Sequence, residues 1–275
     1  MSTPVLKRFY QDPYMQLRSF SLHAVCTAIA VYALIQLRSA DFYNLSFSPW
    51  HLLLVPFAIY IGGLSAVFMH NATHGSFKPH WMNVVAGEIA GIHQLWGFLG
   101  WKLIHLVHHH YSDIVEHDTH PPKNYTFWQF TKIMFAYSSI KISQRYREHF
   151  GTTPRIKAIQ LAGFVAFAVS ILLNLALLFL LLGPVGFLWF YIPSLIANHL
   201  LYAHINHRAH PKNEEGETAP ANLNHNLYFK VANLMWFGIY FHGNHHRWPR
   251  LFNPRYVPAR IPRQRAVLTQ QVDAA

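Results

Sequence analysis

Residues 158–203 read AIQLAGFVAFAVSILLNLALLFLLLGPVGFLWFYIPSLIANHLLYA and contain no lysine, arginine, aspartate or glutamate. This run is about twice the length of roughly 20 residues that a helix needs to cross the apolar core of a bilayer. The pair Gly183-Pro184 divides it, and such a pair is typical of a tight turn. The stretch therefore predicts two antiparallel membrane-spanning helices, residues 158–182 and 185–203.

Two earlier stretches, residues 20–37 and 51–69, also lack charged side chains and predict two further spans. Basic residues precede the first span, follow the second and follow the fourth, whereas the loop at 38–50 holds only Arg38 and Asp41 as charged residues. Because basic loops stay in the cytosol, we expect both termini to be cytosolic. The predicted fold class is an all-α integral membrane protein with four transmembrane helices and a cytosolic, histidine-rich helical cap.

The cap is expected to comprise residues 70–157 and 204–250 of a single domain that covers residues 1–275. Residues 251–275, rich in arginine and proline, predict a poorly packed tail. Residues 84–101 are apolar but short, and a true crossing there would reverse the sidedness of all that follows. They predict a buried or re-entrant segment. Apolar residues at helical spacing over 127–137 predict an amphipathic helix in the membrane interface.

Composition supports a membrane location. The chain has 275 residues, of which 52% are hydrophobic and only 12% are charged. Its net charge of +11 fits either nucleic acid or an anionic lipid surface, and the apolar spans favour the lipid, so no nucleic-acid partner is expected. Cys26 is the only cysteine, which excludes an internal disulfide and a thiolate metal cluster.

Histidine is unusually frequent, with 21 residues, and it is clustered. Residues at i, i+3 and i+4 share one face of a helix. Neutral imidazole is a good ligand for iron, zinc, copper or nickel, and eight imidazoles exceed what one ion takes, so two metals are predicted. The three clusters are His70-Asn-Ala-Thr-His74, His105-Leu-Val-His108-His109 and His242-Gly-Asn-His245-His246.

The motifs HxxxH, HxxHH and HxxHH, set between two pairs of membrane spans, resemble those of the membrane fatty acid desaturases and their hydroxylase and ketolase relatives. The resemblance covers Trp50 to Pro249. It implies an O2-dependent, non-haem di-iron oxidoreductase that introduces a double bond into a fatty acyl chain, with two iron ions as cofactors and O2 as co-substrate. The histidines of the three motifs would then be the metal ligands.

The resemblance also implies roles for residues outside the three motifs. One more histidine is expected from the end of the fourth span, where His204 is preferred, His207 is second and His210 is the third candidate. An acidic residue after the second motif would orient a ligand, as would other nearby acids. An asparagine could hold a metal-bound water. The supporting candidates are Asp118, Asn206 and His207, with Asp113, Glu116 and Asn198 beside them.

The chemistry implies partners. The substrate would be a lipid or another acyl chain, held in the bilayer against aromatic walls to which Trp96, Phe98 and Trp101 contribute. Electrons would come from a separate ferredoxin-like or cytochrome-type donor, which the basic cytosolic face could steer. With no fused haem domain or retention tail in the sequence, we expect a multi-pass protein of a bacterial inner membrane.

Other functions compete with desaturation. The same site could carry out a sister oxidation as a hydroxylase, a carotenoid-type ketolase, an acetylenase or an oxidative decarboxylase. A histidine-rich membrane metal transporter would place its polar ligands at mid-membrane. A zinc hydrolase needs only three protein ligands and an open position. The sequence leaves open the acyl carrier (coenzyme A, carrier protein or lipid), the position oxidised and the oligomeric state.

Overall fold

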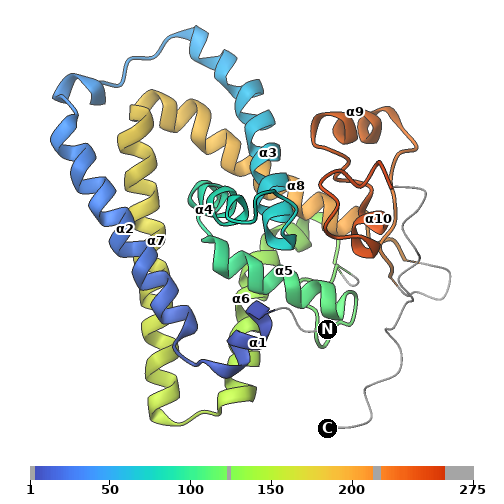
Figure 1. Ribbon diagram of the computed structural model, residues 1–275. Helices are drawn as coiled ribbons and strands as arrows, with labels where there is room; N and C mark the ends of the chain where they lie inside the picture. Colours follow the sequence, from blue (N-terminus) through green and yellow to red (C-terminus); the bar gives the residue numbers. More distant parts are fainter. Residues whose placement is uncertain (1–3, 123–124, 213–217, 258–275) are drawn as a thin grey trace, which may run out of the picture.

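The computed structural model describes residues 4–122, 125–212 and 218–257, and the described part is mostly helical (Figure 1). In these ranges the extended backbone is limited to two isolated bridges, Lys212 with Thr218 and Asn222 with Phe241. The prediction of an all-α fold is therefore confirmed.

Two long helices pack side by side along much of their length: α2 (Met15–Leu37) and α7 (Pro154–Gly186). Their outward side chains are large and apolar, as with Leu22, Ile29 and Leu172, which are each about two-thirds exposed. An exposed apolar surface along helices of this length is typical of contact with lipid rather than with water.

Three stretches are long and apolar enough to cross a membrane. They are α2, the segment Pro49–His74, which joins η2 (Pro49–Leu53) to α3 (Leu54–His74), and the run Pro154–Arg208. The last run contains α7, a π-helical segment η3 (Phe187–Tyr191) and α8 (Ile192–Arg208).

The run is broken at Gly183, where φ is 66° and ψ is 173°. Only glycine adopts this backbone region readily, and Pro184 cannot donate the next helical hydrogen bond. The predicted break at Gly183-Pro184 is confirmed, and α8 turns away from α7 there (Figure 1).

Helix α8 crosses α3 at close range. A Cβ atom on Gly62 would lie 2.3 Å from the carbonyl oxygen of Ser194, so only glycine permits this approach. Asn198 Nδ2 donates to the Gly62 carbonyl at 3.0 Å, and the Tyr202 hydroxyl donates to the Ala66 carbonyl at 2.9 Å. The crossing brings the end of α3, which carries the first histidine motif, beside the end of α8.

The other helices complete the fold. The segment 84–101 forms parts of two helices, because Leu95 and Gly97 both have positive φ and end the first one. With 13 residues, α4 is too short to cross a bilayer. These elements are α1 (Pro4–Gln11), η1 (Ala40–Tyr43), α4 (Met82–Gln94), α5 (Phe98–Tyr111), α6 (Phe127–Phe150), α9 (Leu227–Met235) and α10 (His242–Arg247).

Two packing predictions were wrong in part. On α6, Phe130 and Met134 are buried in a core with Leu201 of α8, because this apolar face covers another helix rather than entering a membrane interface. Residues 251–257 of the predicted loose tail are packed, with Phe252 against Phe68 and its carbonyl accepting a bond from Asn71. The remainder of that tail, residues 258–275, lies outside the described residues.

Candidate metal centre

The ends of α3, α5 and α10 and the residue two positions after α8 meet in one place, and their imidazoles form two groups. Within each group, the possible ligand atoms all lie within 4.8 Å of one another. The first group is His70, His74, His105, His109 and His245, and the second is His108, His210, His242 and His246.

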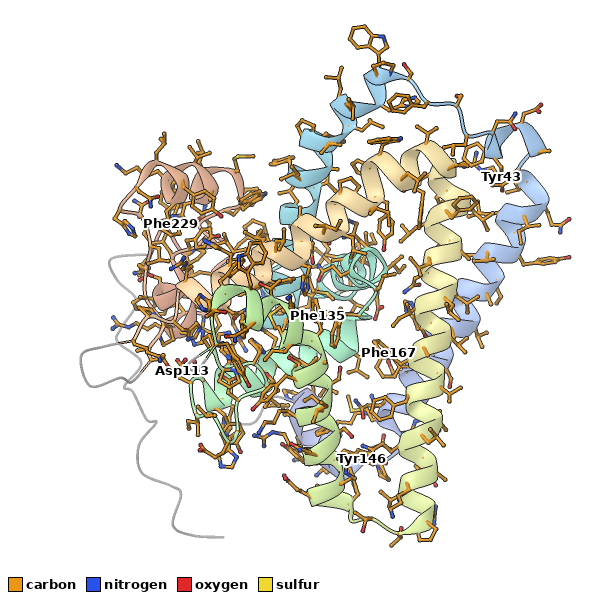
Figure 2. The ribbon with its side chains drawn as sticks, turned by 180° about the vertical axis from the view of Figure 1, so that it is seen from behind. Tyr43, Asp113, Phe135, Tyr146, Phe167 and Phe229 are labelled. Atoms are coloured by element: carbon orange, nitrogen blue, oxygen red, sulfur yellow. The ribbon has the colours of Figure 1, made fainter. Side chains whose placement is uncertain are left out.

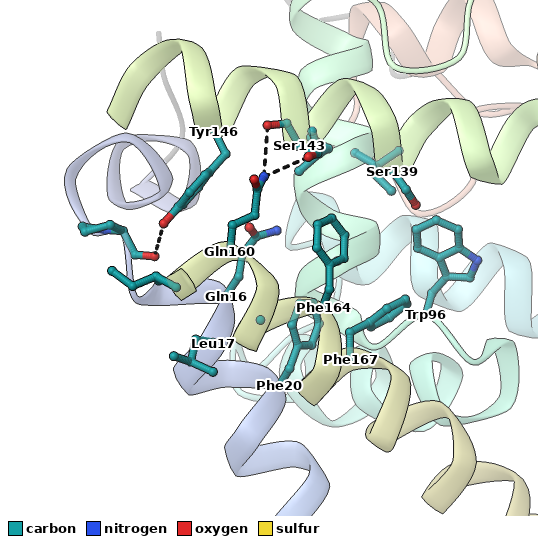
Figure 3. Close-up of a pocket in the computed structure, with 16 residues that line it drawn as sticks. Gln16, Leu17, Phe20, Trp96, Ser139, Ser143, Tyr146, Gln160, Phe164 and Phe167 are labelled. Atoms are coloured by element: carbon teal, nitrogen blue, oxygen red, sulfur yellow. Dashed lines mark hydrogen bonds between the residues drawn. The ribbon is translucent and has the colours of Figure 1, made fainter. Parts of the chain in front are cut away.

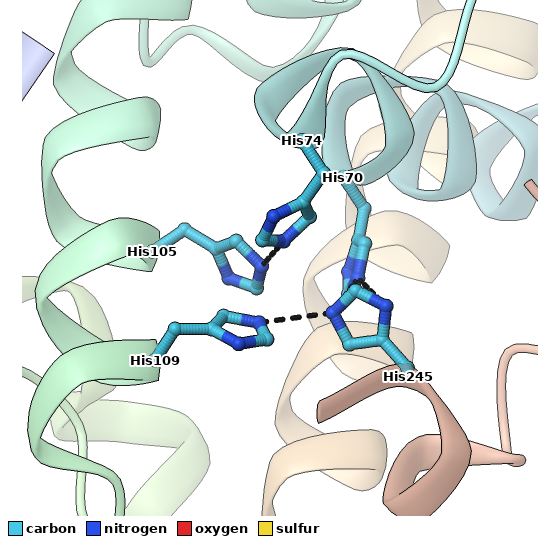
Figure 4. A group of neighbouring side chains, drawn as sticks. All are labelled: His70, His74, His105, His109 and His245. Atoms are coloured by element: carbon cyan, nitrogen blue, oxygen red, sulfur yellow. Dashed lines mark hydrogen bonds between the residues drawn. The ribbon is translucent and has the colours of Figure 1, made fainter. Parts of the chain in front are cut away.

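In the first group, ring nitrogens from three helices face one another (Figure 4). Nε2 of His245 lies 2.7 Å from Nε2 of His70 and 2.9 Å from Nε2 of His109. Nε2 of His74 lies 2.9 Å from Nε2 of His105. A neutral imidazole carries one proton, which sits on one of its two ring nitrogens. A set of converging Nε2 atoms therefore cannot all be paired with one another in hydrogen bonds. The same convergence suits a bound cation.

The second group shows the same convergence. Nε2 of His242 lies 3.0 Å from Nε2 of His210 and 3.1 Å from Nε2 of His246. Nε2 of His108 is buried and has no hydrogen-bond partner among the described residues. A buried polar atom without a partner is costly, and a metal ion would remove that cost.

The two HxxHH motifs divide between the groups in opposite ways. In the motif on α5, the i and i+4 residues, His105 and His109, enter the first group, and His108 enters the second. In the motif on α10, His242 and His246 enter the second group, and His245 enters the first. Each motif therefore contributes histidines to both groups.

The surroundings of these rings favour their neutral form. Burial, reinforced by neighbouring imidazoles, lowers the pKa of His105, His109 and His242 well below the ordinary value. The same causes lower the pKa of His245 and His246. Such rings are neutral at physiological pH, which is the form that binds a metal.

Two carboxylates bond to the outer nitrogens of the second group. Nδ1 of His108 lies 2.9 Å from Asp118 Oδ1, and Nδ1 of His210 lies 2.8 Å from Asp113 Oδ2. Burial opposes charging of His108, but the charge of Asp118 and its hydrogen bond raise the pKa of His108. Asp118 also accepts from the backbone N–H groups of Asp113 and His120. These bonds turn each Nε2 toward the group.

The structure does not bring His204 into either group. Its Nδ1 lies 2.6 Å from the Tyr240 hydroxyl, and its ring packs among aromatic side chains, because this face of α8 looks toward α9. His207 Nε2 lies 2.9 Å from the Tyr125 carbonyl. His210, the third candidate in sequence, occupies the place for which His204 was preferred.

The other supporting candidates bond to residues outside the two groups. Asn206 is buried, and its amide donates to the Tyr202 carbonyl. Glu116 contacts Lys141 only through its backbone carbonyl in the described part of the chain. His120 was missed: it stacks on His108 with ring centroids 4.2 Å apart and forms a third possible ligand group with His108 and Asp118. Its position two residues after Asp118 was the feature of the sequence that could have identified it.

Three cavities bear on ligand access. A small one, of about 20 Å³, is lined by His70 and His245 together with the apolar side chains of Val67, Trp236 and Phe252. A second, of about 60 Å³, lies between α2, α5, α6 and α7 (Figure 3). A third, of about 880 Å³, opens beside His74.

The second cavity contains no histidine of either group, although Trp96 lines it, as does Phe167. In Figure 2, Phe167 and Tyr146 lie well apart from Asp113, whose carboxylate bonds to His210 of the second group. Of the other aromatics expected in a tunnel wall, Trp101 stacks on His105 with ring planes 15° apart, and Phe98 packs against Gly87.

The donor set fits transition metals that prefer nitrogen ligands. Imidazole suits iron, copper, zinc and nickel, whereas magnesium and calcium prefer oxygen. Two groups of five and four imidazoles are more than a single ion can take.

Comparison with known proteins gives one family. A family model described as fatty acid desaturase matches residues 47–270. An sn-1 oleoyl-lipid 12-desaturase from Picosynechococcus sp. is 30% identical over 77 residues, which cover 27% of this chain and 22% of that relative. No solved structure matches.

Proposed function

Because this chain belongs to the fatty acid desaturase family, we propose that it is an O2-dependent, non-haem di-iron oxidoreductase that introduces a double bond into a fatty acyl chain. The observation that carries the proposal is the convergence of buried imidazole nitrogens into two separate groups. The relative with local similarity is named an oleoyl-lipid desaturase, which supports an acyl-chain substrate.

The first group would hold one iron and the second group the other. We assign His210 rather than His204 to the second group, because His210 alone of the three candidates has a ring nitrogen beside His242. Asn206 lies in the last turn of α8, four residues before His210. The second group has one imidazole fewer than the first, which leaves more room for ligands from outside the protein.

The iron pair, when bound, supplies the oxidising power that amino-acid side chains lack. Overall, a CH2–CH2 unit, O2, two electrons and two protons give CH=CH and two molecules of water. The substrate supplies two of the four electrons that reduce O2, and the other two come from outside the substrate. We propose a separate ferredoxin-like or cytochrome-type donor, since the sole cysteine cannot hold an iron–sulfur cluster.

The protein would position the chain and exclude water. The apolar cavity lined by Val67, Trp236 and Phe252 reaches His70 and His245, so a methylene placed there lies against the first group. Trp101 covers one face of His105, and Phe252, which lines the cavity, packs edge to face on Phe77. Positioning and dehydration of the reacting carbons are the contributions expected of such walls.

We also propose four crossings, by α2, α3, α7 and α8, with the histidine groups on the cytosolic side of a bacterial inner membrane. The break at Gly183 supports two crossings within the run Pro154–Arg208. The basic residues outside the apolar spans support a cytosolic cap.

Lipid analysis tests the function. The chain and its His246→Ala variant would be expressed in a bacterium, and fatty acids would be compared by gas chromatography and mass spectrometry. We expect new double bonds with the wild type only, dependent on oxygen and reductant. Hydroxy or keto products would instead show a sister oxidation, and metal uptake without oxygen or reductant would show a transporter.

A further inference from the structure

The largest of the three cavities is a basic cleft on the outer side of the first histidine group. It has a volume of about 880 Å³ and lies between the end of α3, α5, α1 and the segment after α10. Its wall includes His74, Lys102, Arg247 and Arg250, and none of its lining residues is acidic. The cleft therefore combines a candidate metal ligand with three basic side chains.

In the part of the chain that the structure describes, these charges have no acidic partner. Among the described residues, Lys102, Arg247 and Arg250 form no ion pair, since every ion pair present involves other residues. Lys102 is half-buried, with its ammonium 5.1 Å from the centre of the Phe98 ring. Burial lowers the pKa of the Lys102 ammonium. A partly buried cation without an acidic partner is unfavourable unless an anion from outside binds it.

We propose that this cleft binds the phosphate-bearing head group of the acyl substrate, an inference that rests on the proposed function. Lys102 and Arg250 contact the phosphate, and the acyl chain continues toward the first histidine group. Ligand pockets of roughly 300–1,000 Å³ are typical of small molecules, so the size of the cleft fits a head group better than a protein surface. A carotenoid has no phosphate and would leave these charges unpaired.

Phosphate could come from coenzyme A or from a phospholipid, and binding separates the two. Titration calorimetry would be done on the full, iron-loaded chain in neutral detergent, with coenzyme A and with dihexanoyl phosphatidylglycerol as probes. Binding of coenzyme A alone assigns an acyl-coenzyme A substrate, and binding of the phospholipid alone assigns a lipid-bound chain. Binding of neither probe overturns the proposal.

Charge variants locate the site. The double variant Lys102→Gln/Arg250→Gln should weaken probe binding about 10-fold or more, as expected for the loss of two charge-assisted contacts. Lys102→Arg/Arg250→Lys should keep most of the affinity. Lys132→Gln/Lys230→Gln removes the same net charge from exposed positions outside the cleft and should have no effect. Equal binding by all three double variants overturns the proposal.

Steady-state kinetics distinguish the cleft from a donor-docking surface. The Lys102→Gln/Arg250→Gln variant should raise the KM for a phosphate-bearing acyl substrate and leave the KM for an acidic [2Fe–2S] ferredoxin unchanged. The reverse result would assign the cleft to the electron donor and overturn the proposal. Probe binding does not depend on turnover. A wild type that binds phosphate and forms no oxidised acyl product would therefore refute the proposed reaction and not the cleft.

Discussion

Nδ1 of His108 lies 2.9 Å from Oδ1 and 3.0 Å from Oδ2 of Asp118, and both side chains are completely buried. The carboxylate also accepts backbone N–H groups from Asp113 and His120, so its position is fixed from three directions. The bond fixes the proton on Nδ1 and presents the Nε2 lone pair of His108 to the second group.

Asp118→Asn should therefore weaken metal binding without removing a ligand. The amide cannot accept from His108 with the strength of a carboxylate, and loss of such a partner typically costs 10–100-fold in metal affinity. Iron retained per chain after a graded chelator challenge would measure the change. Asp41→Asn, at an exposed position, is the matched control. Equal iron retention by both variants would show that the carboxylate does not support the metal.

His210→Ala and His204→Ala should behave differently. His210 faces His242 across 3.0 Å, so its removal should lower bound iron toward one ion per chain. His204 bonds to Tyr240 outside both groups, so its removal should leave the iron content unchanged. Elemental analysis of the two purified variants would decide between them. Loss of iron only in His204→Ala would reverse our assignment.

The sequence predicted much of this site because local spacing determines helix faces. The i, i+3 and i+4 pattern identified the eight motif histidines that the structure brings together. Spacing could not show that His108 and His245 enter a different group from their neighbours, because that depends on how α5 and α10 meet. It also could not show that α8 ends at Arg208, and the turn after this residue brings His210 inward.

The prediction of the fold had the same limit, because contacts between distant segments could not be read from local patterns. Apolar length and the Gly183-Pro184 pair identified the long helices and the break at Gly183, near the end of α7. Burial of Phe130 and Met134 depended on a distant partner, α8, and an amphipathic pattern fits a membrane interface equally well. Packing of Phe252 against Phe68 likewise joins residues far apart in sequence.

Gly62→Ala should destabilise the crossing of α3 and α8. The added methyl group would meet the Ser194 carbonyl at 2.3 Å, and backbone on both sides would have to move. We expect a loss of about 1–3 kcal/mol, seen as a lower unfolding temperature in detergent. Gly100→Ala is the control, since its methyl group would meet Phe20 at an ordinary 3.5 Å and Trp96 at 4.0 Å. Equal unfolding temperatures for the two variants would contradict the close crossing.

Removal of metal should loosen the centre and leave the long helices in place. Binding of an ion to the folded state alone stabilises that state, and the imidazoles of α10 reach α3 and α5 through the two groups. Hydrogen exchange after chelation should therefore speed up in α10 and at the end of α5. It should not change where α2 packs on α7. Faster exchange throughout, or in neither region, would contradict a local role for the metals.

Iron content measured together with Mössbauer spectroscopy tests the central claim most directly. We predict two irons per chain in the wild type, in two different nitrogen-rich environments, because the groups differ in the number of imidazoles. His74→Ala should diminish one signal and His246→Ala the other. A single metal per chain, bound zinc, or no bound metal after anaerobic purification would contradict a di-iron centre.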